Sequence, residues 1–153
     1  MSGVRREAPH ASSIVVRAGP EALIRVADWI RARGDAHALA PALLDRINVC
    51  AAELVANVLE HGLGGIAGAP VRVALIVGDA RVQLVIDDEA PAFDPLRQAP
   101  RASARMDESR VGGRGIAIVR HFAHELDYAR TPNGNRLTAI FLLDAGAARD
   151  APR

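Results

Sequence analysis

The pattern that most constrains the fold lies in residues 71–86. Apolar side chains occupy every second position on both sides of a Gly-Asp turn, at Val71, Val73, Leu75, Val77, Val82, Leu84 and Ile86. Strict alternation around a short turn predicts a β-hairpin with one buried face. Such a face has to be covered by a second layer of structure.

Segments with helical periodicity can supply that layer. Helices are predicted from Pro20 to Gly34, from Pro41 to about His61 and from Gly113 to about Ala123. The second helix has a buried stripe made of Leu43, Ile47, Cys50, Leu54 and Val58. Further strands are predicted at 13–17, 125–130 and 136–143. This order predicts an α+β fold, with a mostly antiparallel mixed sheet and its helices on one face.

The length of 153 residues indicates one domain. We expect the domain to span residues 13–143, between a flexible arm (1–12) and a flexible tail (144–153). No apolar run reaches the roughly 18 residues of a membrane span, and the first dozen residues lack the apolar core of a secretion signal. The expected location is the cytoplasm, with no membrane partner. A net charge of +1 predicts no direct binding of nucleic acid.

All 19 basic residues are Arg, so the sequence excludes every kind of site that needs a Lys. A P-loop and a eukaryotic-type protein kinase each need a Lys for the phosphates, and a Schiff base needs a Lys as well. The sequence excludes all three. Cys50 is the single cysteine, so no internal disulfide exists, and its place on the buried stripe predicts a core residue.

Three patches carry residues suited to chemistry. Glu53 and Asn57 are one helical turn apart, so one helix face offers oxygens that can bind a magnesium ion or accept a proton. Asp88 continues the inward face of a strand, where a carboxylate needs a donor such as the amino group of adenine. Gly113 and Gly115 open a helix, where bare backbone amides can bind phosphates. Together the patches predict a nucleotide site.

Each patch alone has a simpler interpretation. The three could be a solvated helix face, an aspartate bonded to its own turn, and a flexible glycine turn. Either of two adjacent aspartates could supply the carboxylate that binds the base, because Asp87 directly precedes Asp88. Strand parity favours Asp88.

The patches resemble the N-box and the two glycine boxes of the GHKL ATP-binding fold. The chain is most similar to the small bacterial anti-sigma factors that are also serine kinases, over about residues 13–143. Residues 53–62 are similar to the pattern E-x-x-x-N-x-x-x-H-G of that branch, and residues 88–95 are similar to its pattern D-E-A-P-x-F-D-P. Residues 112–120 are similar to its pattern G-G-x-G-I-x-[IL]-V-R. Residues 127–130 and 134–138 match the C-terminal motifs of the branch less closely.

The resemblance implies a two-layer α/β sandwich that binds ATP and Mg2+. It makes Asn57 the magnesium ligand and Glu53 the catalytic general base that activates a serine of a protein substrate. Asp88 would receive the adenine amino group, and segment 94–111 would be the lid over ATP. Thr138 would lie near adenine, and Arg105 or Arg110 would reach the terminal phosphate. The implied nucleotide-binding residues are Asn57, Asp88, Ala90, Gly113, Arg114, Gly115, Ile116, Thr138, Arg105 and Arg110.

The function implied is that of an anti-sigma factor and serine-protein kinase in a partner-switching pathway. Such a protein phosphorylates a STAS-domain anti-anti-sigma partner, sequesters a sigma factor or similar regulator, and forms a homodimer. Ala90 stands where the first glycine box usually has glycine. Its β-carbon motivates an alternative, a catalytically inactive binding module whose shape is set by ATP or by an empty site.

Two other interpretations remain. One is the catalytic fragment of a histidine kinase, against which we note that no helix pair with a phospho-acceptor histidine precedes residue 13. The other is an α+β domain that binds no nucleotide.

Overall fold

The computed structural model describes residues 8–64, 66–97 and 114–144. Its strands are β1 (His10–Arg17), β2 (Pro70–Val77), β3 (Arg81–Asp88), β4 (Glu125–Arg130) and β5 (Asn135–Leu142). Its helices are α1 (Ala22–Ala36), α2 (Pro41–Asn57) and α3 (Arg114–Phe122). A π-helical turn, η1 (Val58–Gly62), directly follows α2, and a short 3-10 helix, η2 (Pro95–Arg97), follows β3.

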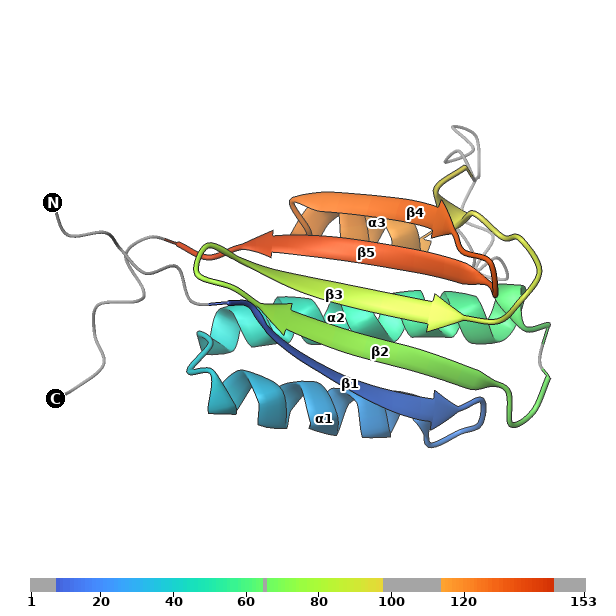
Figure 1. Ribbon diagram of the computed structural model, residues 1–153, viewed down its shortest axis with the longest axis horizontal. Helices are drawn as coiled ribbons and strands as arrows, with labels where there is room; N and C mark the ends of the chain where they lie inside the picture. Colours follow the sequence, from blue (N-terminus) through green and yellow to red (C-terminus); the bar gives the residue numbers. More distant parts are fainter. Residues whose placement is uncertain (1–7, 65, 98–113, 145–153) are drawn as a thin grey trace, which may run out of the picture.

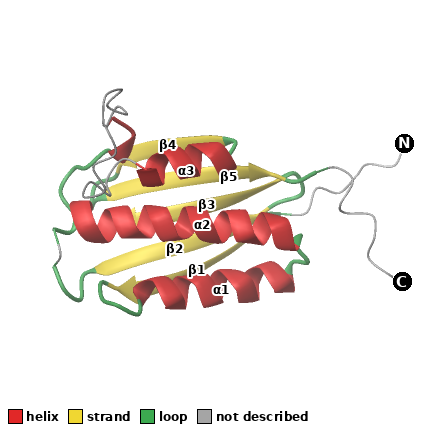
Figure 2. Cartoon of the chain, turned by 180° about the vertical axis from the view of Figure 1, so that it is seen from behind, coloured by secondary structure: helices red, strands yellow, loops and turns green. Residues whose placement is uncertain are grey.

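The strands of the described residues form one sheet in the order β1-β2-β3-β5-β4, and every neighbouring pair is antiparallel. The helices α1, α2 and α3 all cover the same face of this sheet, with α2 across its middle (Figures 1 and 2). The predicted α+β class and the single helical layer are therefore confirmed. No helix in the described ranges is long and apolar enough to cross a membrane.

The core lies between the sheet and the helices. The alternating side chains of the central hairpin are buried there, as predicted, except for the partly exposed Val77 at the end of β2. The predicted stripe of α2 is buried along its whole length. On β5 the same alternation buries Leu137, Ala139 and Phe141.

Several boundaries differ from the prediction, and those of β1 and α1 have a clear reason. β1 begins at His10 rather than at residue 13, because its first residues pair with the end of β2. α1 runs through Gly34 to Ala36 instead of ending at Gly34. A β-carbon on Gly34 would overlap the side chain of Leu44 on α2. This glycine therefore allows two helices to approach closely and does not end the first one.

The second helix changes character before its predicted end. α2 stops at Asn57, and in η1 the N–H of Leu63 donates to the carbonyl of Val58 at 2.8 Å, a bond across five residues. His61 lies in this wider turn. The centroid of its ring is 5.9 Å from that of Phe93.

The buried thiol of Cys50 leads to a first prediction. Burial, together with the charge of Glu53, raises the pKa of Cys50 from 9.0 to about 11. A shift of this size lowers the thiolate fraction about 100-fold at pH 8, and burial also blocks access. We expect native protein to react with an aromatic disulfide reagent at least ~100-fold more slowly than protein unfolded in guanidinium, followed by absorbance. Equal rates in the two states would contradict the buried position.

Candidate functional site

Three element ends meet at one end of the molecule. The C-terminal ends of α2 and β3 lie beside the N-terminal end of α3, although these segments are far apart in the sequence (Figures 1 and 2). The same ends carry Glu53 and Asn57, Asp88, and Gly115. The fold therefore brings together the three patches.

Glu53 lies against the first turn of α3. A β-carbon on Gly115 would be 2.5 Å from Oε2 of Glu53, which is closer than side-chain atoms approach one another. Glycine at this position allows the backbone of α3 to reach the carboxylate. The first N–H groups of a helix have no partner within the helix and attract anions. A carboxylate and an anion-binding helix end therefore share one wall.

Asn57 follows Glu53 by one turn and is 9% exposed. Its Nδ2 is buried and has no hydrogen-bond partner among the described residues. Buried amides are nearly always paired in proteins, so this N–H donor has room for an acceptor such as a phosphate oxygen. A carboxamide oxygen is a hard ligand of the kind that Mg2+ prefers alongside phosphate oxygens. Asn57 therefore fits a phosphate-bound magnesium ion, with the carboxylate of Glu53 in the same wall.

Asp88 is 7% exposed and points to the helical side of the sheet. Its Oδ1 accepts hydrogen bonds from the backbone N–H of Ala90 at 2.8 Å and from Nδ2 of Asn135 at 2.9 Å. Among the described residues, both hydrogen bonds to this carboxylate are accepted by Oδ1. The second oxygen, Oδ2, remains as an acceptor for the amino group of a ligand.

Asp87 faces the other side of the sheet. Its two oxygens accept from Nε and Nη2 of Arg136, at 2.6 Å and 2.9 Å. This hydrogen bonding and the negative charge of Asp87 raise the pKa of Arg136 above its ordinary value. Strand parity therefore places Asp88, and not Asp87, on the face of the sheet that the helices cover.

Ala90 does not place its methyl group in an open site. Ala90 is 2% exposed. A β-carbon built on Gly62 would lie 3.7 Å from the β-carbon of Ala90, which is an ordinary van der Waals contact. The methyl group packs against the turn after α2. The methyl group therefore lies in the core and not on the surface.

Asn135 is the residue at this site that the sequence did not reveal. It begins β5 opposite Asp88 and is 2% exposed. Thr138, which was expected near adenine, pairs instead with Val85 and lies between the buried Leu137 and Ala139. Its side chain is on the opposite face of the sheet from Asp88, so the structure does not bring these two side chains together. Asn135 has the inward parity of Leu137, which is the signal that could have identified it.

A comparison with known families agrees with this geometry. The family model of the histidine kinase-like ATPase domain matches residues 16–141. The chain belongs to this family. Among curated proteins it is similar to a serine/threonine-protein kinase, BtrW, of Bordetella bronchiseptica. The two sequences are 33% identical over 95 residues. The matched region covers 60% of this chain and 66% of the relative, which is just under two thirds of its length. A histidine kinase-like ATPase domain implies nucleotide binding.

Some predicted residues of the ATPase domain lie outside the described residues, namely Gly113, Arg105, Arg110 and most of the expected lid. Arg114 is exposed at the first described position of α3. Ile116 is 8% exposed and belongs to the core, so it is the backbone of Ile116 that can meet a ligand. Of the expected lid, residues 94–97 are described and contain η2.

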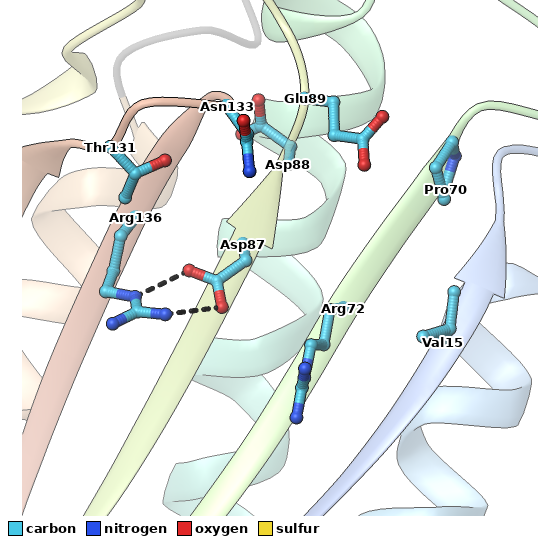
Figure 3. Close-up of a pocket in the computed structure, with 9 residues that line it drawn as sticks. All are labelled: Val15, Pro70, Arg72, Asp87, Asp88, Glu89, Thr131, Asn133 and Arg136. Atoms are coloured by element: carbon cyan, nitrogen blue, oxygen red, sulfur yellow. Dashed lines mark hydrogen bonds and ion pairs between the residues drawn. The ribbon is translucent and has the colours of Figure 1, made fainter.

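The ATPase domain also has a hollow of about 370 Å3 on its open sheet face (Figure 3). Its lining includes Arg72 and the Asp87–Arg136 pair, and it reaches Asp88 only at the end of β3. Glu53, Asn57 and Gly115 do not line it. The hollow is therefore separate from the site that the three patches form.

Gly134 fixes the distance between the β4–β5 turn and the end of β3. A β-carbon on Gly134 would overlap the main-chain carbonyl of Asp88, and neither backbone can move without disturbing the sheet. We expect Gly134→Ala to lower the free energy of unfolding by about 1–3 kcal/mol, measured by urea denaturation. Gly19→Ala is a matched control, since its nearest neighbour would be 3.9 Å away. Equal stability of the two variants would contradict the close approach at Gly134.

Proposed function

We propose that this protein is a serine-protein kinase and anti-sigma factor of a partner-switching pathway. It binds Mg-ATP, phosphorylates a serine of a STAS-domain anti-anti-sigma partner, and sequesters a sigma factor or similar regulator. The observation that carries the kinase proposal is the Glu53 carboxylate, held against the start of α3 one turn from Asn57. The name of the relative, a serine/threonine-protein kinase, supports the same activity.

The site residues have distinct roles in this proposal. Glu53 accepts the proton of the incoming serine hydroxyl, and the backbone at Gly115 binds the phosphates. Asn57 holds the magnesium ion, whose charge neutralises the phosphates. Asp88 accepts the amino group of adenine through Oδ2. Phosphoryl transfer needs mainly positioning and charge neutralisation, and these groups supply both.

Arg114 adds a positive charge where the phosphates are expected. Its side chain is exposed, and it directly precedes Gly115 at the start of α3. A chain without Lys needs Arg for contacts of this kind, and the guanidinium fork suits phosphate oxygens. We therefore include Arg114 among the phosphate-binding residues of the proposed site.

Incubation with a partner protein tests the activity. The purified protein is mixed with Mg-ATP and a STAS-domain protein from the same genome, and phosphoserine is located in the partner by mass spectrometry. Phosphate on a single serine supports the kinase proposal. Saturable ATP binding with tight partner binding but no phosphate would favour the inactive binding module. Phosphate on a histidine of the protein itself would favour a histidine kinase fragment.

The burial of Ala90 weakens the argument for the binding-module alternative. It was suggested by the β-carbon of Ala90, which packs against the turn after α2 rather than in the open site. The kinase proposal is therefore preferred. A chain that binds no Mg-ATP in a calorimetric titration would contradict the kinase proposal and would favour the binding module with an empty site.

A further inference from the structure

We propose that Asn135 is a positioning residue of the nucleotide site and determines which oxygen of Asp88 meets the ligand. This role rests on the nucleotide site proposed above and adds a residue to it. Asn135 lies outside the three patches and is 2% exposed, so it acts through its neighbours and not by touching solvent.

The amide nitrogen of Asn135 is held by acceptors. Nδ2 donates to Oδ1 of Asp88 at 2.9 Å and to the carbonyl of Pro91 at 3.0 Å. These bonds use both N–H groups of the amide. Asn135 therefore bridges the end of β3 to the segment that follows it.

The amide oxygen of Asn135 is held by donors. Oδ1 accepts from the hydroxyl of Tyr128 at 2.7 Å, from Nη1 of Arg130 at 3.1 Å and from the backbone N–H of Phe93 at 3.2 Å. Donors surround the oxygen and acceptors surround the nitrogen, so the amide has one orientation and cannot be flipped. The hydrogen-bonding direction toward Asp88 is therefore fixed.

The fixed amide determines the geometry of the Asp88 carboxylate. Its Oδ1 receives two donors, from Ala90 and Asn135, which hold the plane of the group. Oδ2 is then presented as an acceptor that does not have to reorient when a ligand binds. Arg130 also donates to the carbonyl of Ala90 at 2.8 Å, so the same network holds the chain next to the carboxylate.

The substitution Asn135→Asp tests this role through pH. The charged and titratable groups that face the position in the described residues are Asp88 from β3, and Tyr128 and Arg130 from β4. The variant keeps an acceptor for Tyr128 and Arg130 but brings a second carboxylate against Asp88. Two carboxylates this close raise the pKa of one of them, and its protonated form restores a donor to Oδ1.

We therefore expect a pH-dependent loss of affinity for Mg-ADP. The ratio of variant to wild-type Kd, measured by calorimetry from pH 5.5 to 8.5, should be at least ~30 at the high end and fall as the pH is lowered. Taking the ratio at each pH cancels the titration of ADP itself. The control Gln83→Glu makes the same change of an amide to a carboxylate on the face of β3 that points away from Asp88, and it should give a ratio below ~3 at every pH. A ratio for Asn135→Asp that does not change with pH would overturn the positioning role.

A second variant covers the case in which Asn135→Asp does not fold, as judged by circular dichroism. Asn135→Ser removes the direct bond to Asp88 without adding charge. The measured quantity is the preference for ADP over inosine diphosphate, whose base has a carbonyl in place of the amino group. We expect the preference to fall at least ~10-fold, because a loosened carboxylate no longer selects the amino group. Equal losses for both nucleotides would indicate a structural role and overturn the proposal.

The behaviour of the wild type separates this inference from the proposed function. A wild type that shows no saturable binding of Mg-ADP or Mg-ATP would contradict the nucleotide site itself. A wild type that binds ADP, together with Asn135 variants that keep its affinity and selectivity, would contradict only the role of Asn135.

Discussion

Glu53→Gln should lower phosphoryl transfer to the protein substrate by about 10²- to 10⁴-fold, the range expected for loss of a general base. Glutamine has nearly the same shape and fits the space beside Gly115, but it cannot accept the proton of the serine hydroxyl. The affinity for Mg-ATP should stay within a few-fold of wild type. Single-turnover transfer to the STAS-domain protein, with calorimetry for ATP, measures the two effects separately.

The matched control for this variant is Asp45→Asn, which makes the same change of charge on an exposed position of the same helix. It should transfer phosphate at the wild-type rate. If Glu53→Gln were as active as Asp45→Asn, another group would have to take the proton. A general decrease of both ATP binding and transfer in Glu53→Gln would instead indicate that the carboxylate binds the metal or shapes the site.

The second large effect is expected at Asp88. Asp88→Asn should weaken Mg-ATP binding at least ~100-fold, because the two donors on Oδ1 will hold the amide oxygen in its place. The amide NH2 then faces the amino group of adenine, so an acceptor is replaced by a donor. Calorimetric titration with Mg-ATP measures the loss, and circular dichroism shows whether the variant is folded.

Asp87→Asn makes the same chemical change on the neighbouring residue, which points to the opposite face. It should leave the affinity for ATP unchanged. Its ion pair with Arg136 is partly exposed, so its loss should cost no more than about 1 kcal/mol of stability. ATP binding that fails in Asp87→Asn but survives in Asp88→Asn would show that the wrong aspartate has been assigned.

The fold could be predicted where the spacing of apolar residues in one segment determines which of its faces is buried. Alternation in the central hairpin and the three-and-four spacing of α2 each specify one buried face, and the structure buries those faces. Parity also predicted that Asp88 is on the buried face and Asp87 on the other. The boundaries of the elements were less predictable. Glycine is typical of a helix end, but Gly34 lies inside α1 and allows the close approach of Leu44 from α2. The sequence has no local signal for a contact of this kind.

The site was predictable as a set of patches but not as a network. Asn135 follows Asn133 and Gly134, which are typical of a turn, and its role depends on groups contributed by β3 and β4. The π-helical turn after Asn57 likewise has no periodic signal in the sequence. The expectations for Gly113, Arg105 and Arg110 remain predictions, because these residues lie outside the described part of the chain.

The hydrogen bond between Asn135 and Asp88 joins residues that are 47 positions apart. The hairpins β2–β3 and β4–β5 are local in sequence and can form early, whereas pairing β3 with β5 closes a long loop at a cost in chain entropy. The site is complete only after that late step. A nucleotide that binds there therefore stabilises only the fully assembled chain, and its cellular concentration shifts the balance between folded protein and species open to proteolysis.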